Sequence, residues 1–291
     1  MKPPAFDYRD PETLEETLAL LAVYGPDAKV LAGGQSLMPL LNLRLVRPAL
    51  LIDLRHLAEL AHVNLNGGLT IGAMVRQRTV EWHPGIAAGW PLLRAAVRLV
   101  GHPTIRNMGT LGGSLAHADP SAELLAAAVA LEGTIEAASR QGRRQIPAET
   151  FVRGFFTTAL EPDELLVAVH FPPRAAGEGW AFQEVARRRG DFALVSVACL
   201  VSLDARGRIR AARLVVGGCG PAPVYVSEVE EVLCGAIPAV DAFREAGRLV
   251  QQAVDPPTDL HATAAYRRHA AAGLTVRALT EACGRAIGRA T

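Results

Sequence analysis

Hydrophobic residues near the start of the chain recur at the spacing of one helix face. The positions that carry this pattern are Leu14, Leu18 and Leu21, at i, i+4 and i+7. Two signals compete for the start of the helix: Asp10 with a proline after it, and a capping box formed by Thr13 and Glu16. Gly25, with a proline directly after it, predicts where the helix ends.

Short apolar runs bounded by turn residues predict strands. These runs cover residues 29–32, 50–54, 69–73, 164–172, 192–203 and 209–216. Helical patterns lie between and after them, at residues 36–45, 90–100, 121–131, 243–254 and 276–287. Because the second half has strands first and helices afterwards, we expect an α+β fold and not a regular parallel α/β fold. The small and polar residues at 174–179 predict a domain boundary near residue 175.

The composition of the chain argues against several classes of function. Lys plus Arg is 30 and Asp plus Glu is 29, so the net charge of +1 argues against a nucleic-acid binder. The apolar stretches are shorter than the ~20 residues that span a bilayer, and the first ten residues contain no secretory signal. The four cysteines lie far apart, so we expect reduced thiols in a cytoplasmic protein and no metal or iron–sulfur site. Any redox chemistry of this chain would need an organic cofactor.

Two segments contain paired glycines, at residues 31–37 (L-A-G-G-Q-S-L) and 109–114 (G-T-L-G-G-S). Glycines let backbone N–H groups approach an anion closely, and a helix start after the first segment would add unpaired donors. Two such loops suit the two phosphates of one dinucleotide. Neither matches a Walker loop or a Rossmann fingerprint, and for either segment alone a simple turn is the commoner explanation.

A resemblance to a known family adds to these patterns. The chain contains A-G-G-Q-S-L-M-P, L-I-D-L, I-R-N-M-G-T-L-G-G-S-L-A-H-A-D-P-S-A-E, R-R-R-G-D-F-A and A-Y-R-R-H in order. It thereby resembles the FAD-binding subunit of the molybdenum hydroxylases, which include carbon monoxide dehydrogenases and xanthine dehydrogenases. The resemblance implies an α+β fold with a two-part FAD-binding domain of the vanillyl-alcohol-oxidase/PCMH type at residues 1–175, with subdomains of about 1–55 and 56–175. A smaller C-terminal domain at 176–291, an antiparallel sheet with helices, would follow.

The same resemblance implies a non-covalent FAD and a set of contacts to it. The residues expected around the cofactor are Leu31, Ala32, Gly33, Gly34, Gln35, Ser36, Leu37, Gly101, Ile105, Thr110, Leu111, Gly112, Gly113, Ser114, Glu123, Leu166 and Gln183. Within this set Glu123 would accept a hydrogen bond from the polyol or ribose, and Leu166 would pack on the flavin. Gln183 stands where xanthine dehydrogenases have a lysine, Ser114 where asparagine is frequent, and Glu123 where aspartate is usual.

By the same resemblance the chain would be an electron-transfer subunit without catalytic or metal-binding residues of its own. A large molybdenum-cofactor subunit would oxidise the substrate, and a small subunit with [2Fe–2S] clusters would pass electrons to FAD. The three chains would form a heterotrimer, and two heterotrimers would form a dimer. Two alternatives remain open: a free-standing FAD-dependent oxidoreductase and a non-enzymatic nucleotide-binding module. We interpret His117 as a solvated loop residue, His102 as part of a turn, and the arginines at 187–189 as a solvated edge.

Overall fold

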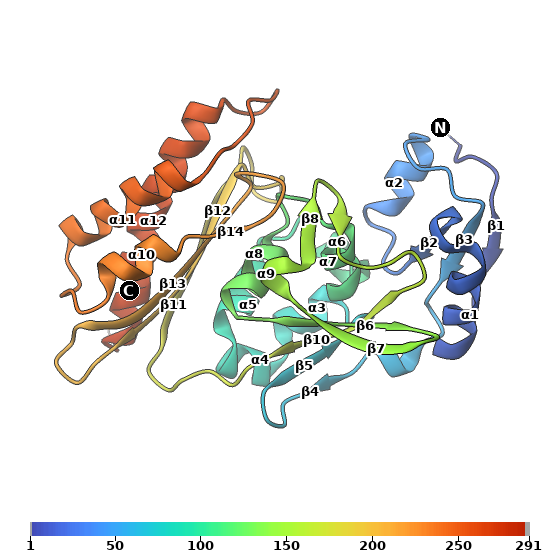
Figure 1. The fold of residues 1–291 in the computed structure, drawn as a ribbon, viewed down its shortest axis with the longest axis horizontal. Helices are drawn as coiled ribbons and strands as arrows, with labels where there is room; N and C mark the ends of the chain where they lie inside the picture. The colour runs from blue at the N-terminus through green and yellow to red at the C-terminus, as the bar shows by residue number, and fades with distance from the viewer. Residues whose placement is uncertain (1, 289–291) are drawn as a thin grey trace.

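The computed structural model describes residues 2–288 and has three parts arranged along its longest axis (Figure 1). The N-terminal part is a three-stranded parallel sheet in the order β1-β3-β2. Its elements are β1 (Asp7–Arg9), α1 (Leu14–Tyr24), the 3₁₀ turn η1 (Gly25–Asp27), β2 (Ala28–Leu31), α2 (Leu37–Asn42) and β3 (Leu50–Asp53).

Helix α1 begins after Thr13, and this settles the competition between its two predicted starts. The Thr13 hydroxyl accepts a hydrogen bond from the backbone N–H of Glu16 at 3.2 Å, as an N-cap side chain does. Leu18 and Leu21 are buried in one hydrophobic cluster with Leu50 and Ile52 of β3. The predicted apolar stripe therefore holds the helix on the parallel sheet.

The middle part is a five-stranded antiparallel sheet in the order β4-β5-β10-β6-β7, with a set of short helices on it. Its strands are β4 (Val63–Asn64), β5 (Leu69–Gly72), β6 (Thr134–Ser139), β7 (Gly142–Pro147) and β10 (Leu165–Phe171), and a hairpin is formed by β8 (Val152–Gly154) and β9 (Thr157–Thr158). The helical elements are η2 (Ala58–Leu60), α3 (Gln77–Trp82), α4 (Pro84–Gly89), α5 (Pro91–Val97), α6 (Pro103–Met108), α7 (Leu111–His117), α8 (Glu123–Ala130) and α9 (Ala148–Phe151).

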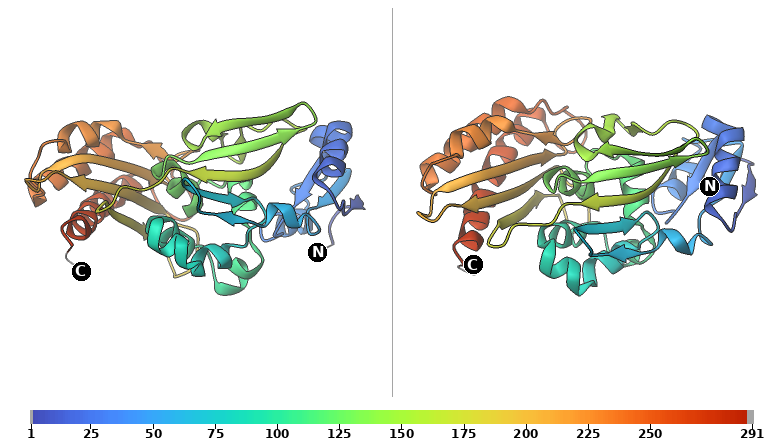
Figure 2. Two further views of the ribbon diagram at one scale, coloured as in Figure 1. Left: turned by 90° about the horizontal axis from the view of Figure 1, so that it is seen from below. Right: turned by 60° about the horizontal axis from the view of Figure 1, so that its bottom comes forward.

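The C-terminal part is a four-stranded antiparallel sheet in the order β11-β12-β13-β14, with helices on its outer face (Figure 2). Its elements are β11 (Gly179–Val185), β12 (Val195–Leu203), β13 (Ile209–Gly217), β14 (Val224–Tyr225), α10 (Ser227–Leu233), α11 (Val240–Ala253) and α12 (Ala264–Ala286). Alternate residues of β12 belong to two separate hydrophobic clusters: Val197 and Cys199 pack with the helices, whereas Ala198 and Leu200 pack with the middle part. Burial of both faces explains why this strand is a continuous apolar run.

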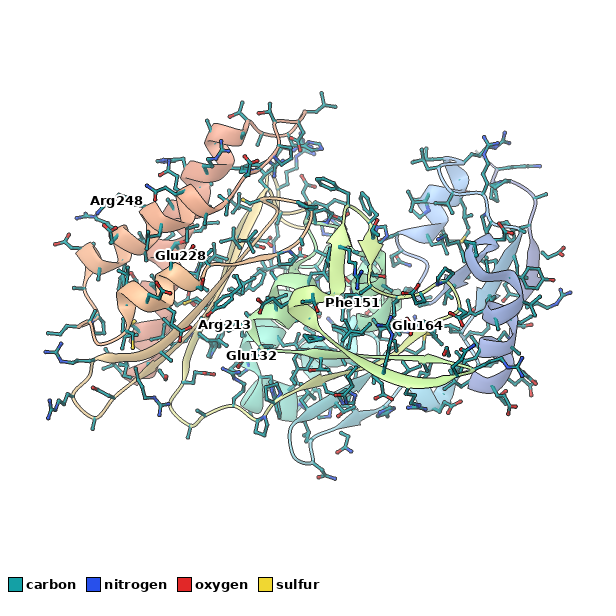
Figure 3. All side chains as sticks on the ribbon, viewed as in Figure 1. Glu132, Phe151, Glu164, Arg213, Glu228 and Arg248 are labelled. Atoms are coloured by element: carbon teal, nitrogen blue, oxygen red, sulfur yellow. The ribbon has the colours of Figure 1, made fainter. Side chains whose placement is uncertain are left out.

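Helix α8 joins the middle and C-terminal parts. All eight of its residues are buried, and its side chains share one cluster with Ala198 and Val215 of the C-terminal sheet. A helix that is apolar all round is buried on all sides, and its alanines let the neighbouring strands come close. Arg213 of β13 adds hydrogen bonds to the Val129 carbonyl at 3.2 Å and to Glu149 at 2.9 Å (Figure 3).

The predicted α+β class and the order of its two parts are confirmed, while several element ends differ. The strand predicted to start at residue 192 begins at Val195, because residues 192–194 belong to a loop without strand pairing. The helix predicted over 90–100 ends at Val97, and the helix predicted over 36–45 ends at Asn42. None of the helices in the described residues is long and apolar enough to cross a membrane.

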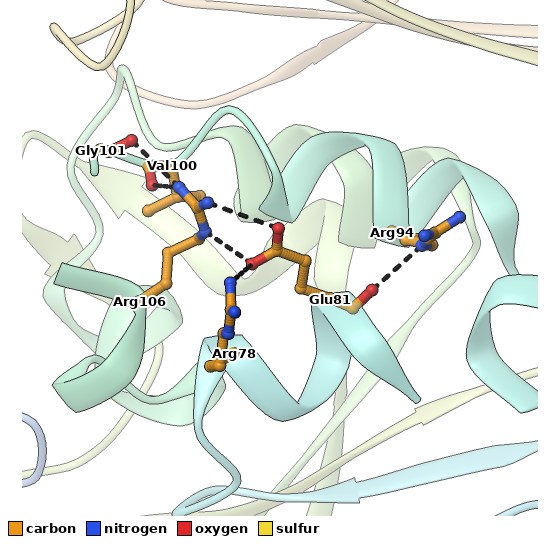
Figure 4. A network of polar contacts seen from close by, with 6 residues as sticks. All are labelled: Arg78, Glu81, Arg94, Val100, Gly101 and Arg106. Atoms are coloured by element: carbon orange, nitrogen blue, oxygen red, sulfur yellow. Dashed lines mark hydrogen bonds and ion pairs between the residues drawn. The ribbon is translucent and has the colours of Figure 1, made fainter. Parts of the chain in front are cut away.

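A buried ion pair braces the helices of the middle part (Figure 4). The guanidinium of Arg106, on α6, donates to Glu81 of α3 at 2.9 Å and also to the carbonyls of Val100 and Gly101. Both charged side chains are less than a tenth exposed. Burial alone would raise the pKa of Glu81, but the hydrogen bond and charge of Arg106 outweigh it and hold that pKa below its usual value.

We expect Glu81→Ala to lower the free energy of unfolding by about 3–5 kcal/mol, because it leaves the buried Arg106 guanidinium without its partner. Urea denaturation measures this loss. The matched control is Asp241→Ala, which removes an exposed ion pair with Arg244 and should change stability by less than ~0.5 kcal/mol. Equal losses in the two variants would contradict a bracing role for the buried pair.

Candidate functional site

The two glycine-rich segments lie in direct backbone contact. A Cβ atom on Gly33 would lie 2.4 Å from the carbonyl oxygen of Met108 and 2.7 Å from the Cα atom of Gly109. A Cβ atom on Gly113 would lie 3.4 Å from the Cβ atom of Ala32. Gly33 is therefore the position where one segment touches the other, and a side chain there would push them apart.

The first segment runs from the end of β2 to the start of α2. Among the described residues, no hydrogen bond is made by the backbone N–H groups of residues 33–36. Gly34 has a φ of 72°, in the left-handed region that favours glycine, and the side chain of Gln35 folds back to donate to the Gly33 carbonyl at 2.9 Å. The segment thus presents several unpaired donors at the place where the second segment approaches.

The second segment is the start of a helix, which the sequence patterns did not predict. Thr110 caps α7, and its hydroxyl accepts a hydrogen bond from the N–H of Gly113 at 3.0 Å. The N–H groups of Leu111 and Gly112 donate to the carbonyls of Val75 and Ala73, each at 3.0 Å. These donors serve internal pairing, contrary to the expectation that the whole glycine pair offers free N–H groups. Gly112 is a packing position, since a Cβ atom on it would lie 2.6 Å from the Ala73 Cβ atom.

Gly101 and Ile105 lie on the segment that the buried Arg106 holds in place. Gly101 has a φ of 47°, and a Cβ atom on it would lie 3.3 Å from the Ile105 side chain. His102 is the N-cap residue of α6. Gly190 of the C-terminal part packs against its imidazole, since a Cβ atom on Gly190 would lie 2.5 Å from that ring. This segment therefore joins the middle part to the loop after β11.

A cavity of about 180 Å³ lies between the chain after β3, η2 and the start of α3. Its lining includes Arg55, Met74, Arg76 and Thr79. The guanidinium of Arg76 donates to the Met108 carbonyl, the atom that faces Gly33. Arg76 thus links the cavity wall to the chain just before the second glycine segment, whereas the charge of Arg55 is paired with Asp53.

Two carboxyl groups, the buried Glu123 and the half-buried Glu184, lie near the junction of α8 and the C-terminal sheet. Glu123, the first residue of α8, is 5% exposed, and burial raises its pKa to about 8, with smaller contributions from the charges of Glu184 and Asp119. Burial also raises the pKa of Glu184, on β11, to about 7. The Oε2 atom of Glu184 has no hydrogen-bond partner among the described residues. Glu184 was not among the residues predicted for the site, although strand alternation places it on the same face of β11 as the core residue Phe182.

Two other candidates, Leu166 and Gln183, are engaged by other parts of the protein. Leu166, on β10, is 3% exposed and belongs to the large core cluster of the middle part. The Gln183 side chain donates to Glu281 of α12, so it points to the opposite face of β11 from Phe182. The structure does not bring the Gln183 amide to the two glycine segments.

The interpretation of His117 as a solvated residue is wrong. Its ring lies 5.2 Å from the ring of Phe156, and burial lowers its pKa. The arginines at 187–189 are exposed, as expected for a solvated edge. Arg267 is buried and donates to the carbonyls of Leu194 and Gly218, so this residue of the Y-R-R motif serves packing within the chain.

Comparison with protein families gives two matches that together span most of the chain. Residues 4–174 match the FAD binding domain in molybdopterin dehydrogenase. Residues 180–282 match the CO dehydrogenase flavoprotein C-terminal domain.

Individual proteins are similar over nearly the whole chain. The 6-hydroxypseudooxynicotine dehydrogenase complex subunit alpha of Paenarthrobacter nicotinovorans is 39% identical, over 98% of this chain and 97% of its own length. A carbon monoxide dehydrogenase structure from Hydrogenophaga pseudoflava has a TM-score of 0.95 at 34% identity, covering 98% of this chain and 99% of the other. Quinoline 2-oxidoreductase from Pseudomonas putida 86 has a TM-score of 0.94 at 39% identity, covering 99% of each chain.

Burial of Glu123 predicts that the protein without added ligand loses stability as pH rises. This carboxyl ionises near its ordinary pKa when unfolded but near pH 8 when folded, so its contribution falls by about 1.4 kcal/mol per pH unit between those values. We expect Glu123→Gln to flatten this fall between pH 6 and 8, as measured by urea denaturation at each pH. Glu132→Gln, at the other end of α8 with a half-exposed side chain, should keep the wild-type slope. An unchanged slope in Glu123→Gln would contradict this assignment.

Proposed function

The chain belongs to the family of FAD-binding medium subunits of the molybdenum hydroxylases, and we propose that it carries electrons from [2Fe–2S] clusters on a partner subunit to an external acceptor. It is an oxidoreductase component, and its cofactor is FAD. The observation that carries the proposal is the backbone contact between Gly33 and residues 108–109. This contact brings two glycine segments from distant parts of the sequence to one place, where a diphosphate could be held from two sides.

The residues present fit this cofactor. The unpaired N–H groups of residues 33–36 provide donors for phosphate oxygens, and the close approach of Gly113 to Ala32 leaves no room for a larger side chain between the segments. We propose that residues 31–37 and 110–114 hold the diphosphate, with Gly101 and Ile105 beside them. Glu123 would accept hydrogen bonds from the polyol or ribose, and Leu166 would supply an apolar surface for the flavin.

Gln183 is left out of the proposed contacts. Its amide is engaged by Glu281 on the far face of β11. A glutamine also lacks the positive charge of the lysine that stands at this position in xanthine dehydrogenases. We therefore assign Gln183 to the packing of β11 against α12.

When bound, FAD supplies redox chemistry in single-electron or paired steps, and the protein supplies binding, orientation and electrostatics. The glycine segments place the diphosphate, and the ion pair of Arg106 and Glu81 keeps the segment of Gly101 in position. The cysteines all lie in the C-terminal part, at Cys199, Cys219, Cys234 and Cys283. We therefore propose a non-covalent cofactor, with the molybdenum cofactor and the iron–sulfur clusters on partner subunits.

We further propose a division into a FAD-binding domain at 1–175 and a C-terminal domain at 176–291, and a cytoplasmic complex. Relatives of this chain are named as a complex subunit and as medium chains. By analogy, a large and a small subunit would assemble with this chain into heterotrimers that pair as dimers. The external acceptor is a separate molecule that the enzyme reduces.

Gly113→Val should yield folded protein without flavin, because the added side chain meets the Thr110 hydroxyl and Ala32 where the segments approach. The measurement is flavin absorbance per protein after purification, with circular dichroism to check folding. Gly89→Val is the matched control, because a Cβ atom at Gly89 meets nothing within 4 Å. Full flavin occupancy in Gly113→Val would contradict the proposed diphosphate site.

Purification of the tagged chain from its native cells tests its place in a complex. We expect it to carry two partner chains, one with molybdenum cofactor and one with iron–sulfur absorbance, in equal amounts. Recovery of a yellow single chain that oxidises a substrate by itself would instead identify a free-standing flavoenzyme. A colourless chain would support a nucleotide-binding module.

A further inference from the structure

Helix α2, which follows the first glycine segment, exposes apolar side chains as a group. Leu41 is the one residue of this helix that is buried. Met38 is 37% exposed, and Leu43 and Leu45, just after the helix, are 53% and 70% exposed. The Leu45 N–H donates to the Leu40 carbonyl at 3.0 Å and so folds this stretch of chain back against the helix. Apolar side chains that are exposed together at one place mark an interaction surface.

This exposed group borders the contact between the two glycine segments. A Cβ atom on Gly34 would lie 3.3 Å from the Cγ atom of Met38. The carbonyl oxygen of Met108 faces Gly33, and Met108 is itself 50% exposed. We define the α2 patch as the four exposed residues Met38, Leu43, Leu45 and Met108. Its two methionines are flexible side chains that adapt to a facing surface.

The charged residues of the segments that form the α2 patch are all positive. Residues 31–48 and 103–118, which carry the patch and the glycine segments, contain no Asp or Glu. Arg44 and Arg47 are exposed, and within residues 2–288 their guanidinium groups donate only to the main-chain carbonyls of Lys2 and Arg44. Met and Arg are enriched in protein interfaces, whereas Asp and Glu are depleted there. The surface that complements this patch is therefore apolar, with carboxylates around it.

We propose that the α2 patch is the docking surface for the [2Fe–2S] subunit, which presents apolar side chains and carboxylates to it. This inference rests on the proposed function, because it names the place where that partner binds. Electron transfer slows steeply with distance, so the subunit that delivers electrons must lie beside the cofactor. The α2 patch borders the segments proposed to hold the cofactor, and its positive charge matches an acidic partner.

Leu45→Glu places a carboxylate in the α2 patch, where it meets apolar groups and the negative charges of the proposed partner. In the complex purified from native cells through a tag on this chain, we expect iron per tagged chain to fall at least about tenfold. Flavin per chain and the circular dichroism spectrum should stay at the wild-type level. Ile237→Glu is the matched control, because Ile237 is 62% exposed in the C-terminal part, and it should keep the full iron content.

Arg47→Glu tests the charge of the partner surface. The variant complex should dissociate more readily than the wild type on dilution at low salt, and the difference should shrink at high salt because ions screen exposed charges. Mass photometry of the diluted complex measures the intact fraction. Arg206→Glu, which reverses an exposed charge in the turn between β12 and β13, should match the wild type. Equal dissociation of Arg47→Glu and wild type at low salt would overturn an acidic partner surface.

The outcomes separate this inference from the proposed function. A wild-type chain that carries neither flavin nor an iron–sulfur partner overturns both. An intact wild-type complex together with full iron content in Leu45→Glu overturns the docking surface alone. A Leu45→Glu complex that keeps its iron and loses its flavin also overturns it, since the patch then contacts the cofactor.

If Leu45→Glu does not fold, a cross-link provides the test. Leu43→Cys, labelled with a short photo-crosslinker in the assembled complex, should form an adduct with the [2Fe–2S] subunit, identified by mass spectrometry. The wild type, whose Cys234 is exposed, gives the background. An adduct with the large subunit alone, or no adduct beyond the background, would overturn the docking surface.

Discussion

The close approach of two backbones at Gly33 is the constraint on which the candidate site depends. Met108 and Gly109 press against this position so closely that any side chain would collide with the main chain. The N-terminal sheet contacts the helices of the middle part at this point, because β2 leads into one glycine segment and α6 leads into the other. The site is consequently built from main chain, with the surrounding side chains holding it in shape.

A second level of organisation comes from α8. Its small apolar residues fit between the middle part and the C-terminal sheet, so the two parts share one hydrophobic core and not merely a polar contact. The first residue of that helix is Glu123, beside the C-terminal sheet, and its far end lies near the hydrogen bonds of Arg213. The helix that joins the parts thereby also carries a buried carboxyl group at its first residue.

The carboxyl groups removed from solvent in this protein have two different kinds of surroundings. Glu81 is matched by Arg106, and the pair ties two helices and a tight loop together. Within residues 2–288, Glu123 and Glu184 form no ion pair with a cation, and burial raises the pKa of each. Removing one partner of a buried ion pair is costly, whereas a buried carboxyl group without a cation stays protonated to higher pH.

Sequence patterns by themselves determined the α+β class, the main strands, the long helices and the two glycine segments, because these features depend on local periodicity and on glycine itself. The family resemblance added the cofactor and most of its expected contacts. Only the tertiary structure decided that the N–H groups of Leu111 and Gly112 donate to residues 73–75 and that the Gln183 side chain turns to α12. Those outcomes depend on which face of an element meets a neighbour that is distant in the chain, and no local pattern carries that information.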